Sequence, residues 1–200
     1  TDVHDYLYPE PWSRPAHSFL GVILLHVSPD EVNQRPWSEE VGGPTQPAID
    51  RPVFVIGTGR CGLTPLMHVI ALHEEFGWPS QFNDRFPSAM WVSYLSRLSD
   101  LRPFRGRIRQ TWFFPRHTET YNLWDRCFFG FKEPFRDLRA DDVTPMGRQR
   151  FRAVVAAVLA KQGKARFITE YSGWSRIAFI REIFPDARFI HIVRDGRAVA

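Results

Sequence analysis

The chain has 200 residues, of which 44% are hydrophobic, so it can bury one sizeable core and is expected to form a single domain. It carries 26 Lys and Arg against 22 Asp and Glu, a net charge of +4. This mild excess suits a small anionic ligand, and no basic tract is dense enough to indicate a nucleic-acid-binding protein. The two cysteines make neither a disulfide framework nor a zinc-binding pattern.

Residues 1–50 are rich in Pro, Trp and Glu, which is typical of an arm that wraps a domain. The apolar run at 19–27 is shorter than the roughly 20 residues that span a bilayer. It lacks the small-residue cleavage site of a signal peptide, so we predict a core strand or a short helix. These features favour a cytoplasmic protein without a transmembrane segment.

Residues 53–56 form a β-branched and aromatic run that predicts a buried strand, and apolar residues recur at helical spacing over 63–71. Between the two lie Gly57, Gly59 and Gly62. A strand, a glycine-rich turn and a helix form the arrangement that holds a phosphate, because backbone N–H groups approach the anion and the helix N-terminus carries a partial positive charge.

The loop fits the spacing G-x-x-x-x-G-x-T, which is the Walker A frame with Leu63 at the lysine position. Without that lysine nothing in the loop reaches a γ-phosphate, which argues against ATP or GTP hydrolysis and against a small-molecule kinase. Arg60 supplies the charge instead, since a guanidinium binds phosphate in bidentate fashion. The alternative interpretation is a tight strand-to-helix turn without a ligand. Cys61 lies inside the loop, where its small size is a better reason for its presence than reactivity.

The rest of the chain alternates between expected helices and strands. Residues 74–87 read as a polar-aromatic loop, 88–101 as a helix, and 101–139 as loops and short helices that either shape a pocket or simply pack. The pattern then predicts helices at about 144–162, 175–184 and from 195, and strands at 166–171 and 188–194. Such alternation predicts an α/β fold with a parallel sheet.

Ligands of parallel sheets bind beyond the carboxyl ends of the strands. This rule places three segments around one crevice: 57–64, 170–173 and 194–196. Among the histidines, His73 is expected to cap the first helix, and His191 is expected to lie in the core.

Two blocks of the sequence together resemble the sulfotransferase family that uses 3′-phosphoadenosine 5′-phosphosulfate (PAPS). The first is PVFVIGTGRCG at 52–62 with ALH at 71–73, and the second is FPDARFIHIVRDGRAVA at 184–200. The resemblance implies a P-loop-like three-layer fold with a central parallel sheet flanked by helices, in a domain over 51–200 that is incomplete at its C-terminus. It also implies transfer of a sulfonate group from PAPS to a hydroxyl or amine, without a metal ion.

The resemblance also assigns roles to residues. The loop would hold the phosphosulfate, with Arg60 on the bridging phosphate and Thr64 donating a hydroxyl, and Arg194 would hold the 3′-phosphate. The implied nucleotide-binding residues are Gly59, Arg60, Cys61, Gly62, Leu63, Thr64 and Arg194. A general base should follow the first helix, and Asp84 is the first choice, the alternative being a surface ion pair with Arg85.

Three departures from the family pattern support a second hypothesis. Leu63 stands where relatives usually carry Ser or Thr, and Glu170 stands where many carry a lysine, so that its charge would repel a sulfonate unless it is protonated or turned away. The sequence also ends before the serine that usually partners Arg194. The alternative is therefore a catalytically impaired nucleotide-binding or scaffold protein. The acceptor could be a sugar, a phenol or a lipid, and nothing in the sequence selects among them.

Overall fold

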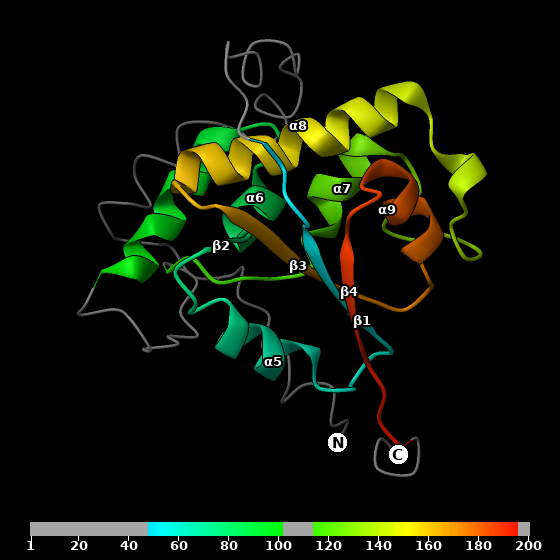
Figure 1. Cartoon of the computed structure of the whole chain (residues 1–200), viewed down its shortest axis with the longest axis horizontal. Coiled ribbons are helices and arrows are strands. Elements are labelled where there is room, and N and C mark those ends of the chain that lie inside the picture. Colours follow the sequence, from blue (N-terminus) through cyan, green and yellow to red (C-terminus); the bar gives the residue numbers. More distant parts are fainter. Residues whose placement is uncertain (1–47, 102–113, 196–200) are drawn as a thin grey trace, which may run out of the picture.

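The computed structural model describes residues 48–101 and 114–195. At its centre lies a parallel sheet in the order β2-β3-β1-β4 (Figure 1). The strands are β1 (Val53–Gly57), β2 (Phe76–Gly77), β3 (Arg166–Ser172) and β4 (Arg188–Ile192). The predicted parallel α/β fold is confirmed, while nearly all of the proposed N-terminal arm and the helix expected from residue 195 lie outside the described residues.

Helices cover both faces of this sheet. Figure 1 shows α5 on one side and α7, α8 and α9 on the other. The α-helices are α5 (Leu63–Ile70), α6 (Gln81–Arg85), α7 (Tyr121–Cys127), α8 (Pro145–Gln162) and α9 (Ile177–Ile183). Two 3₁₀ helices, η1 (Met90–Asp100) and η2 (Ala140–Asp142), complete the described elements.

The long helix α8 begins and ends where its sequence predicts. The Thr144 hydroxyl accepts a hydrogen bond from the Gly147 N–H at 3.0 Å, and Pro145 occupies the first helical turn. At the other end, Gly163 adopts a left-handed φ of 67°, a conformation that glycine takes without steric cost. These local signals explain why the expected range of 144–162 is confirmed.

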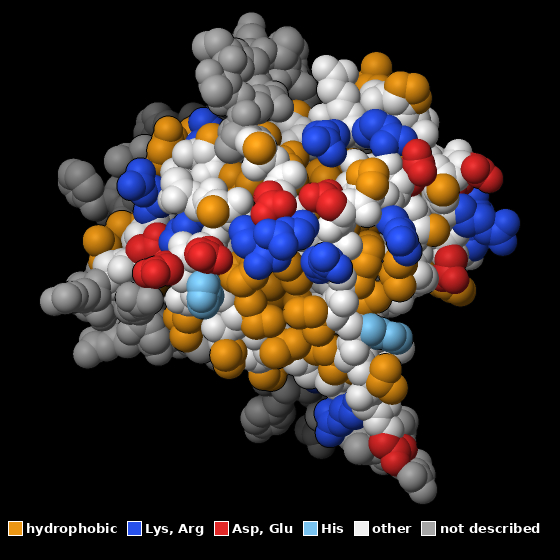
Figure 2. All heavy atoms as spheres, viewed as in Figure 1, with side chains coloured by type: hydrophobic (Ala, Val, Ile, Leu, Met, Phe, Trp, Pro, Cys, Tyr) orange, Lys and Arg blue, Asp and Glu red, His pale blue; other side chains and the backbone are white. Residues whose placement is uncertain are grey.

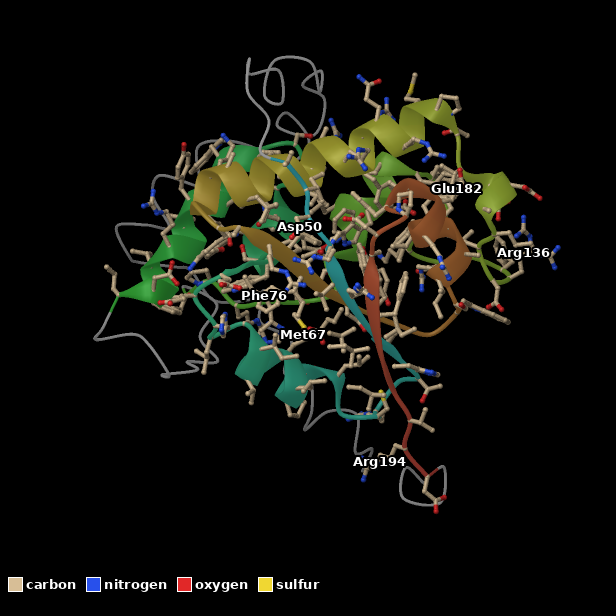
Figure 3. All side chains as sticks on the ribbon, in the orientation of Figure 1. Asp50, Met67, Phe76, Arg136, Glu182 and Arg194 are labelled. Carbon is tan, nitrogen blue, oxygen red and sulfur yellow. The ribbon has the colours of Figure 1, made fainter. Side chains whose placement is uncertain are left out.

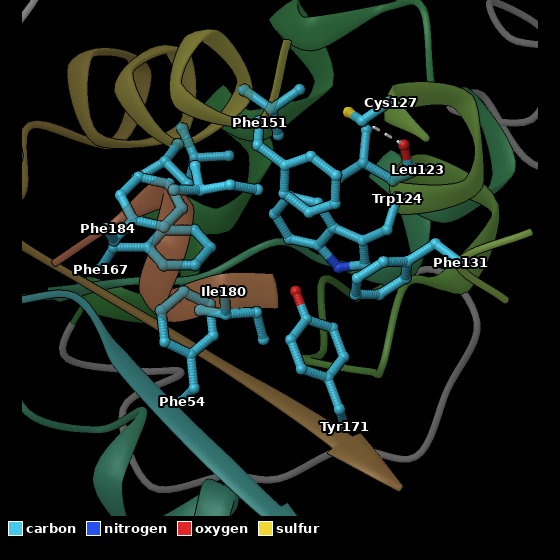
Figure 4. Close-up of a cluster of buried hydrophobic side chains, with 14 of the residues drawn as sticks. Phe54, Leu123, Trp124, Cys127, Phe131, Phe151, Phe167, Tyr171, Ile180 and Phe184 are labelled. Carbon is cyan, nitrogen blue, oxygen red and sulfur yellow. Dashed lines mark hydrogen bonds between the residues drawn. The ribbon is translucent and has the colours of Figure 1, made fainter. Parts of the chain in front are cut away.

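The face of the sheet toward α7, α8 and α9 buries the larger, strongly aromatic core. Trp124 stacks on Phe151 with ring centroids 5.1 Å apart, and Phe54 of β1 lies among Phe167, Tyr171 and Phe184 (Figure 4). Aromatic side chains bury much apolar area each, so they dominate the stability of this side. We call it the aromatic face.

The opposite face, which we call the α5 face, buries a smaller cluster. Val53, Val55 and Ile168 from the strands pack against Leu63 and Met67 of α5. Side chains alternate along a strand, so Ile168 and Glu170 of β3 lie on this face and Phe167 and Tyr171 lie on the aromatic face. Figure 2 shows hydrophobic side chains gathered on the surface where α5 adjoins β1 and β4.

Three expectations need correction. The segment 74–87 is not simply a loop, because Phe76–Gly77 pairs with β3 and Ser80 begins α6 with a capping box to the buried Asn83. The helix expected at 88–101 is present as the 3₁₀ helix η1. His191 is exposed rather than in the core, because β4 is an edge strand of the described sheet.

Within the described residues, none of the helices combines the length and the apolar character needed to cross a membrane.

Candidate functional site

The loop after β1 is shaped by two residues in left-handed conformations. Arg60 has a φ of 64° and Gly62 a φ of 103°. The Cys61 N–H donates to the Thr58 carbonyl at 3.3 Å, which closes a tight turn before α5 begins. No side chain caps the N-terminus of α5, so its first N–H groups stay available to an anion.

Close packing at Gly57 holds this loop against the strands. A Cβ atom at residue 57 would lie 2.4 Å from the Cys61 Sγ and 3.0 Å from the Ile192 carbonyl oxygen. The buried Cys61 thiol therefore takes the space beside Gly57, which agrees with the expectation that this cysteine is present for its size. Glycine is required at residue 57 because any side chain would clash with Cys61 and with the β4 backbone.

The side chains of the loop divide into two groups. Those of Arg60 and Thr64 are exposed, at the open end of the loop and in the first turn of α5. Leu63 is only 7% exposed and packs in the cluster of the α5 face. Its backbone N–H could contact a phosphate, but its side chain belongs to the core, which accounts for a leucine at this position.

Arg194 lies beside the loop. Arg194 follows the end of β4 (Figure 3). Its Nη1 donates to the Arg60 carbonyl at 3.1 Å, and the register of β1 with β4 pairs Gly57 with Ile192, two residues before Arg194. On the other side, the Gly173 N–H donates to the Gly57 carbonyl at 3.2 Å. The ends of β1, β3 and β4 thus meet at one edge of the sheet, as the sequence predicts.

Asp84 has structural partners. One of its carboxylate oxygens accepts from the Asn122 backbone N–H at 2.8 Å, and the other accepts from the Asn122 Nδ2 at 2.9 Å. These contacts tie α6 to the first turn of α7. Burial raises the pKa of Asp84, and the hydrogen bonds from Asn122 oppose that rise. Its role as a general base stays a prediction.

Glu170 lies on the α5 face and is paired with a histidine. It is 3% exposed, and its Oε1 lies 2.9 Å from the Nδ1 of His117. The Nε2 of His117 in turn contacts the Nδ1 of His68 on α5. The Oε2 of Glu170 is buried and has no hydrogen-bond partner among the described residues.

Sequence reasoning did not find this group of three contacting residues. His117 comes from a segment without periodicity, and it is positioned by contacts distant in sequence. Its backbone bridges to Ser80, the Arg116 N–H donates to the Gln81 Oε1 at 2.6 Å, and the Trp78 ring meets His117 edge-on. In the described residues no cluster of His, Cys, Asp and Glu has an arrangement that could hold a metal ion.

A second polar group fixes the end of β3. The Tyr121 hydroxyl donates to the Ser172 carbonyl at 2.8 Å and accepts from the Ser172 N–H at 2.9 Å. The buried Arg176 guanidinium donates to the carbonyls of Phe131 and Ser172. Burial raises the pKa of the neighbouring Glu119, whose carboxylate accepts from Ser172.

Comparison with known proteins agrees with this geometry. The model of the Sulfotransferase family matches residues 52–200. No curated protein gave a significant match. Sulfotransferase STF1 from Mycobacterium tuberculosis H37Rv has a similar structure, with a TM-score of 0.51, 14% identity, and coverage of 84% of this chain and 52% of that one.

Sulfotransferase STF9 from Mycobacterium avium aligns with a TM-score of 0.44 and 16% identity over 88% of this chain and 47% of that one. The chain thus spans about half the length of these two solved structures. At such identities the likeness to STF1 concerns the fold alone, whereas the family model covers most of the sequence. On that match, the chain belongs to the Sulfotransferase family.

Proposed function

We propose that this protein binds PAPS at the loop between β1 and α5 and transfers its sulfonate group to a hydroxyl or amine of a small acceptor. Family membership supports sulfonate transfer in general. The observation that carries the choice of donor is the meeting of an uncapped helix N-terminus with two arginines, Arg60 in the loop and Arg194 bonded to its carbonyl. A nucleotide with phosphates at both ends of its ribose needs two such positive sites.

The residues of the loop fit this ligand. The loop leads into the N-terminus of α5, whose first N–H groups have no side-chain cap, and the exposed Arg60 adds a guanidinium. Thr64 adds a hydroxyl one turn into α5, and Arg194 is assigned to the 3′-phosphate. When bound, PAPS supplies an activated sulfonate, and the chain contributes N–H donors and cations placed where negative charge develops on the leaving phosphate.

The loop needs only to hold the donor in line with the acceptor oxygen, since positioning supplies much of the rate enhancement in such a displacement. A proton must also leave the acceptor. Asp84 is the base predicted from the sequence, although both of its carboxylate oxygens accept hydrogen bonds from Asn122. An Asp84→Asn variant that keeps full transfer activity would remove Asp84 from consideration. The acceptor class, whether sugar, phenol or lipid, and a cytoplasmic location remain predictions as well.

Calorimetry with adenosine 3′,5′-bisphosphate tests the proposal, because this product should bind the same site. We expect saturable binding that weakens on Arg60→Ala and on Arg194→Ala. Arg97→Ala serves as a matched control, since Arg97 is exposed on η1 and also removes one positive charge. No binding at millimolar nucleotide, or equal affinity in all the variants, would reject the proposal.

Two of the three departures that support the catalytically impaired alternative have a structural account. Leu63 packs in the core of the α5 face, and one carboxylate oxygen of Glu170 is paired with His117. Binding of the bisphosphate without any transfer from PAPS would favour that alternative.

A further inference from the structure

Three residues from three separate segments form a continuous contact chain beside α5. Glu170 of β3 contacts His117, and His117 contacts His68 of α5. The first two side chains are 3% and 5% exposed, whereas His68 is half-buried. A buried carboxylate therefore connects through the buried imidazole of His117 to the half-buried imidazole of His68.

The contact chain fixes where each proton lies. An ionised Glu170 accepts only, so the Nδ1 of His117 carries the hydrogen. The Nε2 of His117 is then an acceptor, and the Nδ1 of His68 must donate to it. That leaves the Nε2 of His68 with a free lone pair, because a neutral imidazole carries one hydrogen.

His68 also lies in the right place. It follows Thr64 by four residues on α5, so the two side chains are neighbours on one side of the helix, with Cβ atoms about 5–6 Å apart. Thr64 is exposed in the first turn, where the phosphosulfate is expected to bind. An acceptor held beside Thr64 would therefore lie about one helical turn from His68.

We propose that His68 is the general base of the sulfonate transfer and that His117 and Glu170 are its positioning residues; this inference rests on the proposed function. The acceptor hydroxyl oxygen bonds to sulfur while the bond from sulfur to the bridging phosphate oxygen breaks, and that electron pair leaves with the bisphosphate. The hydroxyl proton passes to the Nε2 of His68. Glu170 balances the positive charge that then spreads over the two imidazoles, and the proton later passes to water.

The charges around His68 suit a base at neutral pH. Burial lowers its pKa from the ordinary 6.5, the neighbouring His117 and Arg116 lower it further, and Glu170 opposes them. Glu119 lies near Glu170 and adds a further negative charge on the buried side. His68 is therefore expected to be neutral at pH 7 and able to accept a proton.

The first test is long-range ¹H–¹⁵N NMR of the histidine rings in the full-length protein without nucleotide. We expect His68 and His117 to carry hydrogen on Nδ1 at pH 7, and His68 to titrate below 6.5. His117→Phe should release His68 from this tautomer, and Glu170→Gln should lower the pKa of His68 further, because a negative charge is lost. A wild-type His68 with its hydrogen on Nε2, or one still protonated at pH 7, would overturn the proposal.

The second test consists of two measurements. One follows sulfonate transfer from PAPS to 4-nitrophenol and to water, and the other follows the binding of adenosine 3′,5′-bisphosphate. His68→Gln should lower kcat by roughly 10²–10⁴-fold, leave nucleotide affinity unchanged, and remove the rise of kcat/KM with pH that reports the His68 pKa. His73→Gln is the matched control, since His73 is exposed just beyond the same helix. It should behave as wild type.

The outcomes separate the two proposals. If the nucleotide binds and transfer proceeds, but His68→Gln keeps the wild-type kcat, the base assignment is wrong and the proposed function stands. If the wild type neither binds the bisphosphate nor consumes PAPS, the proposed function fails and the assignment fails with it. If His117→Phe does not fold, the pKa of His68 measured in Glu170→Gln still tests whether the three residues are coupled.

Discussion

The two faces of the central sheet differ in what fills them. The aromatic face buries rings from β1, β3, α7, α8 and α9 against one another. The α5 face buries a smaller aliphatic cluster, and beside it lie the paired Glu170 and His117 and the loop that holds Arg60. The larger apolar cluster thus lies on one side of the sheet and the proposed site on the other, so substitutions on each side should affect different measurements.

The largest effect is expected from Trp124→Ala. Trp124 is fully buried and stacked on Phe151. Its removal should lower the free energy of unfolding by about 3–5 kcal/mol, measured by urea denaturation. Phe129→Ala is the control, because that ring is 93% exposed and its loss should change stability by less than about 0.5 kcal/mol. Equal effects of the two variants would contradict the assignment of the aromatic core.

Leu63→Ser comes next, because it tests whether the loop leucine belongs to the α5 face. We expect a loss of about 2–5 kcal/mol of stability and no gain in sulfonate transfer, since the side chain packs against Met67 and the strands. Leu72→Ser, at a 40% exposed site beyond the same helix, is the matched control. A stable and more active Leu63→Ser variant would show that the residue faces the ligand.

Arg60→Ala should act on binding instead of folding. Losing a charge-assisted hydrogen bond to phosphate costs about 1.5–3 kcal/mol, so the Kd for adenosine 3′,5′-bisphosphate should rise roughly 10- to 100-fold in calorimetry. Arg60→Gly removes the guanidinium without straining the backbone, because glycine tolerates the left-handed φ of 64°. Both variants should bind equally weakly, and a glycine variant with wild-type affinity would exclude a role for the guanidinium.

The smallest effect concerns the pH dependence of stability. Burial raises the pKa of Glu119 above its ordinary 4.5, so between 4.5 and the native value the folded state binds more protons than the unfolded one. The free energy of unfolding should therefore fall as pH rises through this window. Glu119→Gln should flatten that fall in urea titrations from pH 4 to 7, whereas the exposed Glu74→Gln should leave it unchanged.

Local signals explain most of what could be predicted about the fold. The caps of α8, the strand before the glycine loop and the buried β3 are each specified by residues adjacent in sequence. The segment 74–87 could not be predicted, because β2 is short and depends on its pairing with β3 and on the Gln162 side chain, which bonds both the N–H and the carbonyl of Trp78. Gln162 is 84 residues away from Trp78 in the chain.

The same division holds for the site. The phosphate loop was recognisable because its glycines, its arginine and the flanking strand and helix are consecutive, and backbone conformation is set locally by the residues that tolerate it. Arg194 could be placed beside that loop because the carboxyl ends of parallel strands meet at one edge.

By itself, then, the sequence determined a parallel α/β domain with a glycine-rich turn after its first strand. Only the tertiary structure decided that Leu63 is a core residue, that Glu170 pairs with His117, and that His68 and His117 lie against each other. The reason is that the orientation of a side chain depends on which face of the sheet it occupies and on what packs there, and those neighbours come from distant parts of the chain.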